Sequence, residues 1–395
     1  MITNYTYSQL LAKNKLSTGT NMLLTGKPGT GKTELLRDIC EEYTADGKKV
    51  ATTGSTGMAA SNLDGGRTIH SLLKWHPDAR EYDYELCSET LKGTDLLIVD
   101  EVSMMGSSII NHMARCLRTL DRPPQLLMSG DFFQLPPVKE YRYPFDNPNW
   151  AYFGLEPCIL NEVVRQRDLE FVEMLSRAML ADPSCIRYFN TATQRRIIEG
   201  AICVCTLNLY ADRINQREFM ALPGTAKQYD ALGNTSEAAF KKFRVHEKLY
   251  VKKNMRVMSL RNDSAGRYQN GSLGTVVDMG NDSIKVHFDN GNIVDISRIE
   301  YTLENVKPGE DDVKIEQFPL SGGYAISIHK SQGQTFDSVN IMAPQCWDPG
   351  QLYVALSRAR DIKGIHLMVP ITAESFKADQ RVIDYYRSIT GRFVA

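Results

Sequence analysis

Short apolar runs that end in polar residues recur along the first part of the chain. Residues 21–25, 48–53, 95–100 and 125–130 form such runs, and residues 32–43 between the first two read as a helix. Apolar strands that alternate with helices indicate a parallel sheet covered by helices on both faces. Polar residues at the carboxyl ends of such strands lie where parallel sheets bind ligands. The pattern therefore predicts an α/β fold with a ligand site at one edge of the sheet.

The pattern changes in the second half of the chain. Residues 200–206 form another buried run, but from about 244 to 318 short alternating strands and turn signals replace the helices. Alternation over residues 284–288 leads into Asn290-Gly291, and this combination is a strong hairpin signal. We therefore expect a small antiparallel barrel inserted into a second α/β domain. Buried runs then return at 323–328, 338–342 and 365–369.

The composition is that of an ordinary globular protein. The 395 residues predict two or three domains at roughly 150 residues each, and 42% of them are hydrophobic and 24% charged. Lys and Arg number 46 and Asp and Glu 47, so the net charge of -1 gives no reason to expect a nucleic-acid or membrane partner. The sequence lacks an apolar run of the roughly 20 residues that a membrane helix needs, and also a secretory or transit signal. We therefore expect a cytoplasmic protein.

Eight cysteines are spread along the chain, and none forms a CxxC pair. Zinc and iron–sulfur sites are recognised in sequences by closely spaced cysteine and histidine ligands. The cysteine spacing therefore argues against such a site. Reduced thiols in the core of a cytoplasmic protein are the preferred interpretation.

The segment 26–33, GKPGTGKT, matches the phosphate-binding pattern GxxxxGK[ST] in full. It follows a predicted strand and opens a predicted helix, as the pattern requires. Its glycines, with Thr30 between them, let the backbone wrap a phosphate while the N–H groups of the helix start point at it. We expect Lys32 to reach the β- and γ-phosphates and Thr33 to ligate Mg²⁺. The glycines concerned are Gly26, Gly29 and Gly31.

Carboxylates and an amide follow the next two predicted strands. A carboxylate at such a strand end can hold Mg²⁺ through water, and an adjacent one can polarise the attacking water, so we assign these roles to Asp100 and Glu101. Gln134 is a candidate sensor of the γ-phosphate. Phosphoryl transfer also needs positive charge opposite the phosphates, for which Arg165 and Arg358 are candidates. The residues alone leave open that either arginine is an ordinary surface residue of a helix.

Seven sequence blocks follow one another between about residue 9 and residue 369. They are GKPGTGKT, STGMAA with TIHSLL, LLIVDEVSMM, GDFFQLPPV, LNEVVRQ, YAISIHKSQGQTF and QLYVALSRAR. In these blocks the chain resembles superfamily I helicases of the RecD-like branch, which contains the Dda and PIF DNA helicases. The resemblance implies an ATP-dependent DNA helicase that uses ATP and Mg²⁺, moves 5′ to 3′ along single-stranded DNA and separates forked or tailed duplex DNA.

The resemblance also implies a domain organisation. Two RecA-like P-loop domains would bind ATP in the cleft between them. Residues 1–158 would form the first, with a short strand-separating pin at about 74–93, and residues 159–243 with 319–395 would form the second. Residues 244–318 look like the SH3-like barrel that this branch inserts into the second domain.

Several residue roles follow from the family pattern. A Gln upstream of the phosphate loop reads adenine in the family, and Gln9 resembles that position. Arg165 and Arg358 match two arginines that contact the γ-phosphate from the second domain. Gly333 falls in the block that links the nucleotide to DNA. Lys32, Thr33, Asp100, Glu101 and Gln134 take the roles assigned above.

The same blocks supply candidates for the polynucleotide track. Single strands are commonly held by phosphate contacts and by bases stacked on aromatic side chains. For stacking, the candidates are Trp75 with His76 and Phe132 with Phe133, and at least one of each pair is expected in the core. Residues 244–272 carry seven Lys or Arg against two Asp or Glu, which favours a basic face. Candidate phosphate contacts are Thr56, Thr68, His70, His329 and Ser331.

Two other functions stay open at this level. The same engine could drive an RNA or RNA–DNA hybrid motor, because the preference for DNA and the polarity rest on the resemblance. The second alternative is a nucleotide-gated DNA-binding ATPase that remodels protein complexes without productive unwinding. The predicted pin is short, so this alternative stays possible. We expect single-stranded and forked DNA as partners, no membrane partner, and a monomer.

Overall fold

The chain forms two compact units in the computed structural model. Unit 1 comprises Met1–Glu199 and Ile328–Ala395, and unit 2 comprises Gly200–Ser327. The described residues are 4–390 except 56–58, 60–62, 64–65, 76–81, 138–139, 141, 165–167, 234–236, 244 and 304–312.

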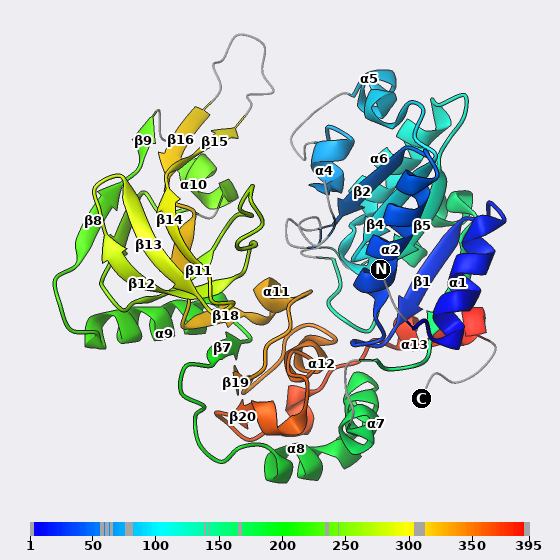
Figure 1. Cartoon of the computed structure of the whole chain (residues 1–395). Coiled ribbons are helices and arrows are strands. Elements are labelled where there is room, and N and C mark those ends of the chain that lie inside the picture. The colour runs from blue at the N-terminus through cyan, green and yellow to red at the C-terminus, as the bar shows by residue number, and fades with distance from the viewer. Residues whose placement is uncertain are drawn as a thin grey trace. The chain divides into compact units, whose positions relative to one another are not determined.

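Unit 1 is built on a six-stranded sheet in which every pairing is parallel (Figure 1). The strand order is β3-β2-β4-β5-β1-β6. These strands are β1 (Met22–Gly26), β2 (Val50–Gly54), β3 (Arg67–Thr68), β4 (Leu96–Asp100), β5 (Gln125–Ser129) and β6 (Glu156–Leu160). The helices of the unit are α1 (Tyr7–Ser17), α2 (Lys32–Ala45), α4 (Ile69–Leu72), α5 (Tyr84–Ser88), α6 (Ser107–Arg118), α7 (Leu169–Met179), α8 (Ile186–Ala192), α11 (Ile328–Ser331), α12 (Gln351–Leu356) and α13 (Gln380–Thr390).

Successive side chains of this sheet enter two separate cores. In β4, Leu96 and Ile98 pack with residues of α1 and α2, while Leu97 and Val99 pack with residues of α6. All four side chains are fully buried. A strand buried on both faces needs apolar residues at every position, so the continuous apolar runs of the sequence are explained. The predicted parallel sheet with helices on both faces is confirmed.

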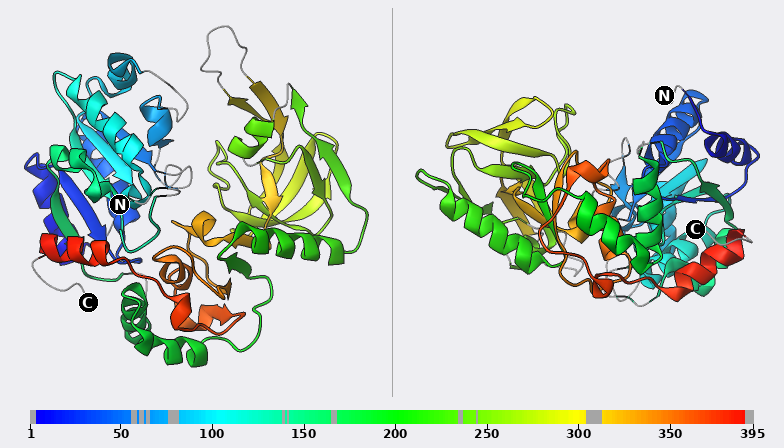
Figure 2. Two further views of the ribbon diagram at one scale, coloured as in Figure 1. Left: turned by 180° about the vertical axis from the view of Figure 1, so that it is seen from behind. Right: turned by 90° about the horizontal axis from the view of Figure 1, so that it is seen from below.

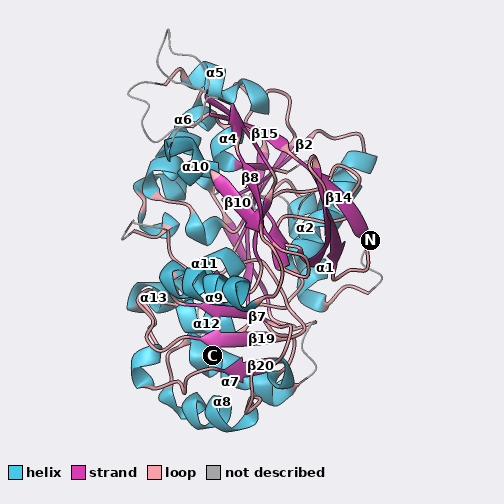
Figure 3. Ribbon diagram, turned by 90° about the vertical axis from the view of Figure 1, so that its left-hand side faces the viewer, coloured by secondary structure: helices cyan, strands magenta, loops and turns pink. Residues whose placement is uncertain are grey.

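A smaller pairing in unit 1 joins two later strands, β19 (Val339–Met342) and β20 (Ile365–Leu367), in parallel. Figure 3 shows these two strands side by side, with α7 and α8 in the same part of the molecule. Both strands fall in buried runs that the sequence predicts at 338–342 and 365–369. Asn340 links β19 to a segment far earlier in the chain, because its amide both donates to and accepts from the backbone of Ile198.

Unit 2 is mainly antiparallel. A five-stranded sheet has the order β14-β13-β12-β11-β17, and two- and three-stranded sheets have the orders β10-β8 and β15-β16-β9. The unit begins with β7 (Ile202–Cys205), which pairs in parallel with β18 (Ala325–Ser327). The other elements are α9 (Asn208–Ala221), β8 (Lys227–Asp230), β9 (Leu232–Gly233), α10 (Glu237–Phe243), β10 (Lys248–Val251), β11 (Arg256–Ser259), β12 (Leu273–Met279), β13 (Ser283–Phe288), β14 (Ile293–Ser297), β15 (Ile299–Leu303), β16 (Val313–Gln317) and β17 (Leu320–Gly322).

The hairpin predicted around Asn290-Gly291 is confirmed. Strands β13 and β14 pair antiparallel, with Ser283 opposite Ser297 and His287 opposite Ile293. Gly291 adopts a φ of 90°, a left-handed conformation that favours glycine. One face of the hairpin enters the core of unit 2, where Val286 and its neighbours are buried.

The last helix of the chain, α13, supports the strand that leads into the phosphate loop (Figure 2). The Tyr386 hydroxyl lies 2.6 Å from Thr25 Oγ1, at the end of β1, and accepts a hydrogen bond from the Phe132 backbone N–H at 3.3 Å. Its ring stacks on Phe133, with centroids 4.7 Å apart. A segment distant in sequence therefore joins the ends of β1 and β5. Among the described helices, none is long and apolar enough to cross a membrane.

We expect Tyr386→Phe to lower the free energy of unfolding by about 1–3 kcal/mol, because buried groups at Thr25 and Phe132 would lose their partner. The measurement is denaturant-induced unfolding in the absence of nucleotide. Tyr385→Phe is the matched control, since the half-buried Tyr385 hydroxyl only accepts a long hydrogen bond from Trp150 Nε1 at 3.3 Å. Equal losses in the two variants would contradict the specific role of Tyr386.

Candidate nucleotide-binding and catalytic site

The phosphate loop between β1 and α2 has no room for side chains at two of its glycines. A Cβ on Gly26 would lie 2.6 Å from the Leu160 carbonyl oxygen, and one on Gly31 would lie 2.8 Å from Gln9 Nε2. Gly29 and Gly31 adopt φ values of 82° and 78°, in the left-handed region. Close contacts therefore favour glycine at positions 26 and 31, and backbone conformation favours it at positions 29 and 31.

Lys32 lies at the first position of α2 and folds back into the loop. Its ammonium donates to the carbonyl oxygens of Gly26 at 2.6 Å and of Lys27 at 3.1 Å. Thr33 follows in the first turn and is half-buried. The start of α2 directs the positive end of its helix dipole toward the loop, which suits an anionic phosphate.

Gln9 lies directly against the phosphate loop. Its side chain is 2% exposed, and its Nε2 donates to the Thr30 carbonyl oxygen at 3.3 Å. Its Oε1 accepts from the Thr6 backbone N–H at 3.0 Å within the capping box that begins α1. Helix α1 and the loop are therefore coupled through this amide, and the structure brings Gln9 to the nucleotide-binding segment as the resemblance implies.

Asp100 ends β4 and Glu101 follows it in a strained backbone conformation; Asp100 is buried and Glu101 is half-buried. Glu101 has a φ of 53°, a left-handed value that costs a non-glycine residue roughly 1–3 kcal/mol. Two hydrogen bonds hold it there: the Ser55 hydroxyl donates to the Glu101 carbonyl oxygen at 2.6 Å, and the Glu101 N–H donates to Asp100 Oδ1 at 2.9 Å. Strain that surrounding bonds maintain is characteristic of functional positions.

The two carboxyl groups oppose each other's ionisation. Burial raises the pKa of Asp100. Burial, and then the neighbouring Asp100, raise the pKa of Glu101, while Lys32 and Arg358 act in the opposite direction. A dication between such carboxylates would relieve both the burial and the repulsion. Oxygen ligands of this kind suit Mg²⁺, so Thr33 and Asp100 fit the predicted metal ligands.

The carboxyl-terminal part of unit 1 reaches the acidic pair through Gln332. Its Nε2 donates to Glu101 Oε2 at 3.2 Å, and its Oε1 is buried without a partner. The adjacent Gly333 has a φ of 77°. Gln332 is a functional candidate that the sequence analysis missed, although it directly precedes Gly333 in the block that was singled out.

Arg358 lies in the same part of the site. Its side chain is 3% exposed, and its guanidinium donates to the carbonyl oxygens of Val354, Ser331 and Gln334. These bonds fix the position of the planar group. Its field lowers the pKa of Glu101, so the charge acts on the acidic pair. This burial excludes the alternative that Arg358 is an ordinary surface arginine.

Gln134 belongs to a buried polar group centred on Asp131. The Asp131 carboxylate accepts from Gln134 Nε2 at 3.4 Å, from the Tyr353 hydroxyl at 3.3 Å and from the Phe133 N–H at 3.0 Å. The Oε1 of Gln134 has no partner and is buried. Asp131 and Tyr353 were not predicted, but Gly130-Asp131 stands directly at a strand end, where a functional carboxylate could have been expected.

The candidate DNA contacts of the first half lie close together around α4. Thr68 caps this short helix by accepting from the Ser71 N–H at 3.2 Å. The rings of His70 and Trp75 lie 4.9 Å apart, and both residues are half-buried. Burial lowers the pKa of His70, which favours the neutral imidazole. Thr56 and His76 lie outside the described residues, as does Arg165 of the catalytic set.

Three other candidates are buried. Phe133 is 6% exposed and stacked on Tyr386, which leaves its ring without a face for a base. Phe132 is fully buried, so neither member of that pair is open to stacking. Ser331 is also fully buried, and its hydroxyl donates to the Ile328 carbonyl oxygen. His329 is partly exposed and lies 3.7 Å from Asp348.

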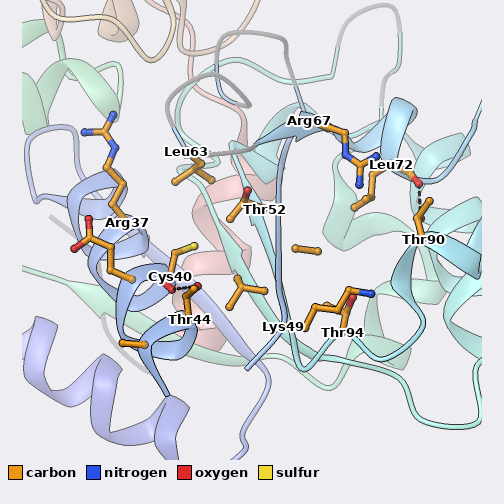
Figure 4. A pocket seen from close by; sticks show the side chains of 14 residues that line it. Arg37, Cys40, Thr44, Lys49, Thr52, Leu63, Arg67, Leu72, Thr90 and Thr94 are labelled. Carbon is orange, nitrogen blue, oxygen red and sulfur yellow. Dashed lines mark hydrogen bonds between the residues drawn. The ribbon is translucent and has the colours of Figure 1, made fainter. Parts of the chain in front are cut away.

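A separate cavity of about 630 Å³ is lined by residues of α2, of β2 and of the edge strand β3 (Figure 4). Arg37 and Arg67 lie on opposite sides of it in this view. Among its described lining residues, none belongs to the phosphate loop or to the Asp100-Glu101 pair. The catalytic groups therefore gather elsewhere, at the carboxyl ends of β1, β4 and β5, as the position of ligands in parallel sheets requires.

Comparisons with known proteins agree with this geometry. Residues 4–144 match the PIF1-like helicase family, and residues 322–361 match the UvrD-like helicase C-terminal domain. The ATP-dependent DNA helicase Pif1 of Bdellovibrio bacteriovorus is 32% identical, over 97% of this chain and 92% of its own length. The ATP-dependent DNA helicase PIF1 of Xenopus laevis is 30% identical over 96% of this chain, which spans 64% of that protein.

The chain belongs to the Pif1 family of helicases. The Pif1 helicase of Candida albicans has a similar structure, with a TM-score of 0.86, 27% identity, and coverage of 99% of this chain and 100% of that one. Bacteroides Pif1 in complex with ADP-AlF3 and single-stranded DNA has a TM-score of 0.81 and 30% identity, with coverage of 99% and 98%. This Pif1-family chain is an ATP-dependent DNA helicase, and ATP with Mg²⁺ are its cofactors.

We expect Glu101→Gln to raise the melting temperature of the nucleotide-free helicase by a few degrees near pH 8. The folded-state pKa of Glu101 lies above the value of 4.5 for an exposed glutamate. Folding therefore takes up a proton between the two pKa values, and stability falls as pH rises through that window. Because Gln does not titrate, its advantage should shrink near pH 5.

Thermal unfolding at the two pH values, without Mg²⁺, measures this effect. Glu374→Gln is the matched control, because Glu374 is exposed and should behave alike at both pH values. A gain for Glu101→Gln that is independent of pH, or a loss near pH 8, would show that Glu101 is ionised without cost in the folded protein.

Proposed function

We propose that this helicase translocates 5′ to 3′ on single-stranded DNA and separates duplex DNA at forks or tails. The observation that carries the proposal is the contact from Gln332 to Glu101. It joins the block containing Gly333 to the residue that would polarise the attacking water. A motor needs such a link, because the chemistry at the phosphate must change the grip on the strand.

The proposed roles at ATP follow the geometry of the site. Lys32 binds the β- and γ-phosphates once it leaves the carbonyl oxygens of Gly26 and Lys27. Thr33 and Asp100 hold Mg²⁺, and Glu101 orients and polarises the attacking water. Gln134 senses the γ-phosphate by donating from Nε2 after its amide flips, which is open to it because Oε1 has no partner. The remaining proposed residues are Gln9, which reads adenine, Gly26, Gly29, Thr30, Gly31 and Gly333, which shape the site, and Arg165 and Arg358, which neutralise the γ-phosphate.

For DNA, we propose phosphate contacts at Thr56, Thr68, His70 and His329 and stacking on Trp75. Small hydroxyl and neutral imidazole groups suit a motor, since each contact is modest and can be released in every cycle. The burial of Phe133 and Ser331 removes support for direct contacts by these two residues, so they are left out of this set. A stacked base on Trp75 would contribute about 1–3 kcal/mol.

We also propose the domain organisation implied by the family resemblance. Residues 159–243 and 319–395 would form the second RecA-like domain, and the antiparallel strands within 244–318 would form an SH3-like barrel. Residues 1–158 would form the first RecA-like domain. The region 74–93 would contain the pin. We propose a monomer that acts as the functional unit.

The experiment that tests this function measures ATP hydrolysis with no polymer, with single-stranded DNA and with single-stranded RNA, and then unwinding of duplexes with a 5′ or a 3′ tail. Lys32→Ala is the inactive control. Stimulation by DNA and unwinding of 5′-tailed duplexes support the proposal. Stimulation by RNA alone would favour an RNA motor, and DNA-stimulated hydrolysis without any unwinding would favour a remodelling ATPase.

We expect Arg358→Ala to lower the rate of DNA-stimulated ATP hydrolysis about a thousand-fold or more, with ATP affinity retained, because charge opposite the γ-phosphate is needed chiefly in the transition state. Steady-state kinetics and nucleotide-binding titrations separate the two effects. Arg360→Ala is the matched control, since Arg360 is exposed and forms an ion pair with Asp337. Normal turnover of Arg358→Ala would refute the assigned role.

We expect replacement of residues 77–81 by a Gly-Ser linker to reduce unwinding of 5′-tailed DNA while DNA-stimulated ATP hydrolysis persists. The replacement stops before Tyr82, because Cys87 and Leu91 beyond it are buried in the core of unit 1. The matched control replaces the exposed residues 223–226 in the same way. Unimpaired unwinding, or equal loss of both activities in a folded variant, would refute the pin assignment.

A further inference from the structure

Two cysteines and a histidine that are scattered in the sequence meet between α5 and α6. One ring nitrogen of His112 and the Sγ atoms of Cys87 and Cys116 all lie within 4.8 Å of one another. His112 and Cys116 lie four residues apart on α6 and so project from the same side of that helix. Cys87 comes from α5, which packs against α6 (Figure 1).

The three side chains are almost completely removed from solvent. The exposed fractions are 5% for Cys87, 3% for His112 and 0% for Cys116. Around them, Tyr82 and Tyr84 cover the imidazole ring, with ring centroids 4.5 Å and 5.3 Å from it. The cluster therefore lies in a site between two helices that is shielded from bulk solvent.

The hydrogen bonding of His112 leaves one nitrogen available. Its Nε2 lies 2.9 Å from the Leu73 carbonyl oxygen, so this nitrogen carries the proton and donates. The Nδ1 atom is therefore unprotonated in the neutral ring, and it is buried without a partner. An unpartnered acceptor in a buried site is costly. A histidine that donates one nitrogen to a backbone carbonyl and presents the other is also the usual arrangement of a metal ligand.

The chemistry of the set selects the ion. Two thiolates and one imidazole are ligands for a borderline or soft transition metal and not for Mg²⁺ or Ca²⁺. Burial raises the pKa of both thiols, that of Cys116 to about 12, so both are protonated without a metal. When a dication binds, the two thiol protons leave to solvent and two metal–sulfur bonds form. The resulting unit of one dication and two thiolates is neutral, which lowers the cost of its burial.

We propose that Cys87, His112 and Cys116 bind one Zn²⁺ ion, with His112 coordinating through Nδ1. Zinc–sulfur bonds of about 2.3 Å and zinc–nitrogen bonds of about 2.0–2.1 Å require only small side-chain rotations from the present spacing. A water molecule completes the coordination. The ion is structural, because it lies away from the nucleotide site and fastens α5 to α6.

The ion would reinforce contacts that already join these helices. Arg115 of α6 donates to the Tyr84 hydroxyl at 2.8 Å, and Thr119 donates to the Ser88 hydroxyl at 2.9 Å. The segment held in this way lies within the region 74–93 that would contain the pin. A rigid attachment would allow force at the pin to be transmitted to the core. Zinc binding itself is independent of the helicase function and can be tested without it.

The test uses the full chain, purified from cells grown with added zinc and passed through a chelating resin, with metal content measured by mass spectrometry. We expect about one zinc per chain in the wild type and close to none in Cys116→Ser and His112→Gln. Cys158→Ser is the matched control, since Cys158 is equally buried but belongs to β6 and a different core. It should retain the metal.

Cobalt binding to the metal-free protein identifies the ligands without relying on the variants. We expect thiolate-to-cobalt charge-transfer absorption and intense tetrahedral d–d bands, which carboxylates at Asp100 and Glu101 cannot produce. Absence of these bands, or equal metal content in wild type and Cys116→Ser, would overturn the proposal. Loss of metal in Cys203→Ser instead would place the ion at Cys203 and Cys205, whose sulfurs lie 3.7 Å apart, and would also overturn it.

Discussion

Two adjacent carboxyl groups lie at the end of β4, one buried and one half-buried, and the organisation of the site depends on them. Asp100 and Glu101 cannot both be ionised there without compensation, because burial and mutual repulsion each favour the proton. The positive groups of the site answer this requirement. Lys32 and Arg358 act on the same pair from two different segments, and Mg²⁺ would complete the compensation. The acidic pair thus raises the free energy of the empty site, and the binding of positively charged ligands lowers it.

The same constraint explains why hydrogen bonds from surrounding residues fix the backbone of the site. The left-handed backbone of Glu101 persists because Ser55 and Asp100 bond to it, and the phosphate loop is supported through Thr25 by Tyr386. Gln332 approaches the acidic pair from the other side. Preorganised dipoles and charges at a phosphoryl group need such support, since a small displacement weakens every electrostatic contact. We infer that changes at the nucleotide pass to the DNA-facing segments through Gln332. Its amide contacts Glu101, the residue that would polarise the attacking water.

Some of the catalytic set was readable without a structure because its determinants are local. The phosphate loop needs glycines at fixed positions and a helix start, so Gly26, Gly31 and Lys32 follow from a short segment alone. Asp100 and Glu101 follow from an apolar strand that ends in carboxylates. The contacts of Gln332, Tyr353 and Tyr386 could not be read in this way, because each depends on residues hundreds of positions apart being brought together.

The sequence by itself determined the parallel sheet, the hairpin at Asn290-Gly291 and the nucleotide chemistry, since periodicity and turn preference act over a few residues. Only the tertiary structure decided which of the candidate side chains are buried. It enclosed Phe133 and Ser331, which resemble DNA contacts in sequence, and it made Arg358 a fixed internal charge. It also brought Cys87 to His112 and Cys116, although their spacing argued against a metal site. Burial and proximity arise from packing between helices and strands that are remote along the chain, and no local pattern records them.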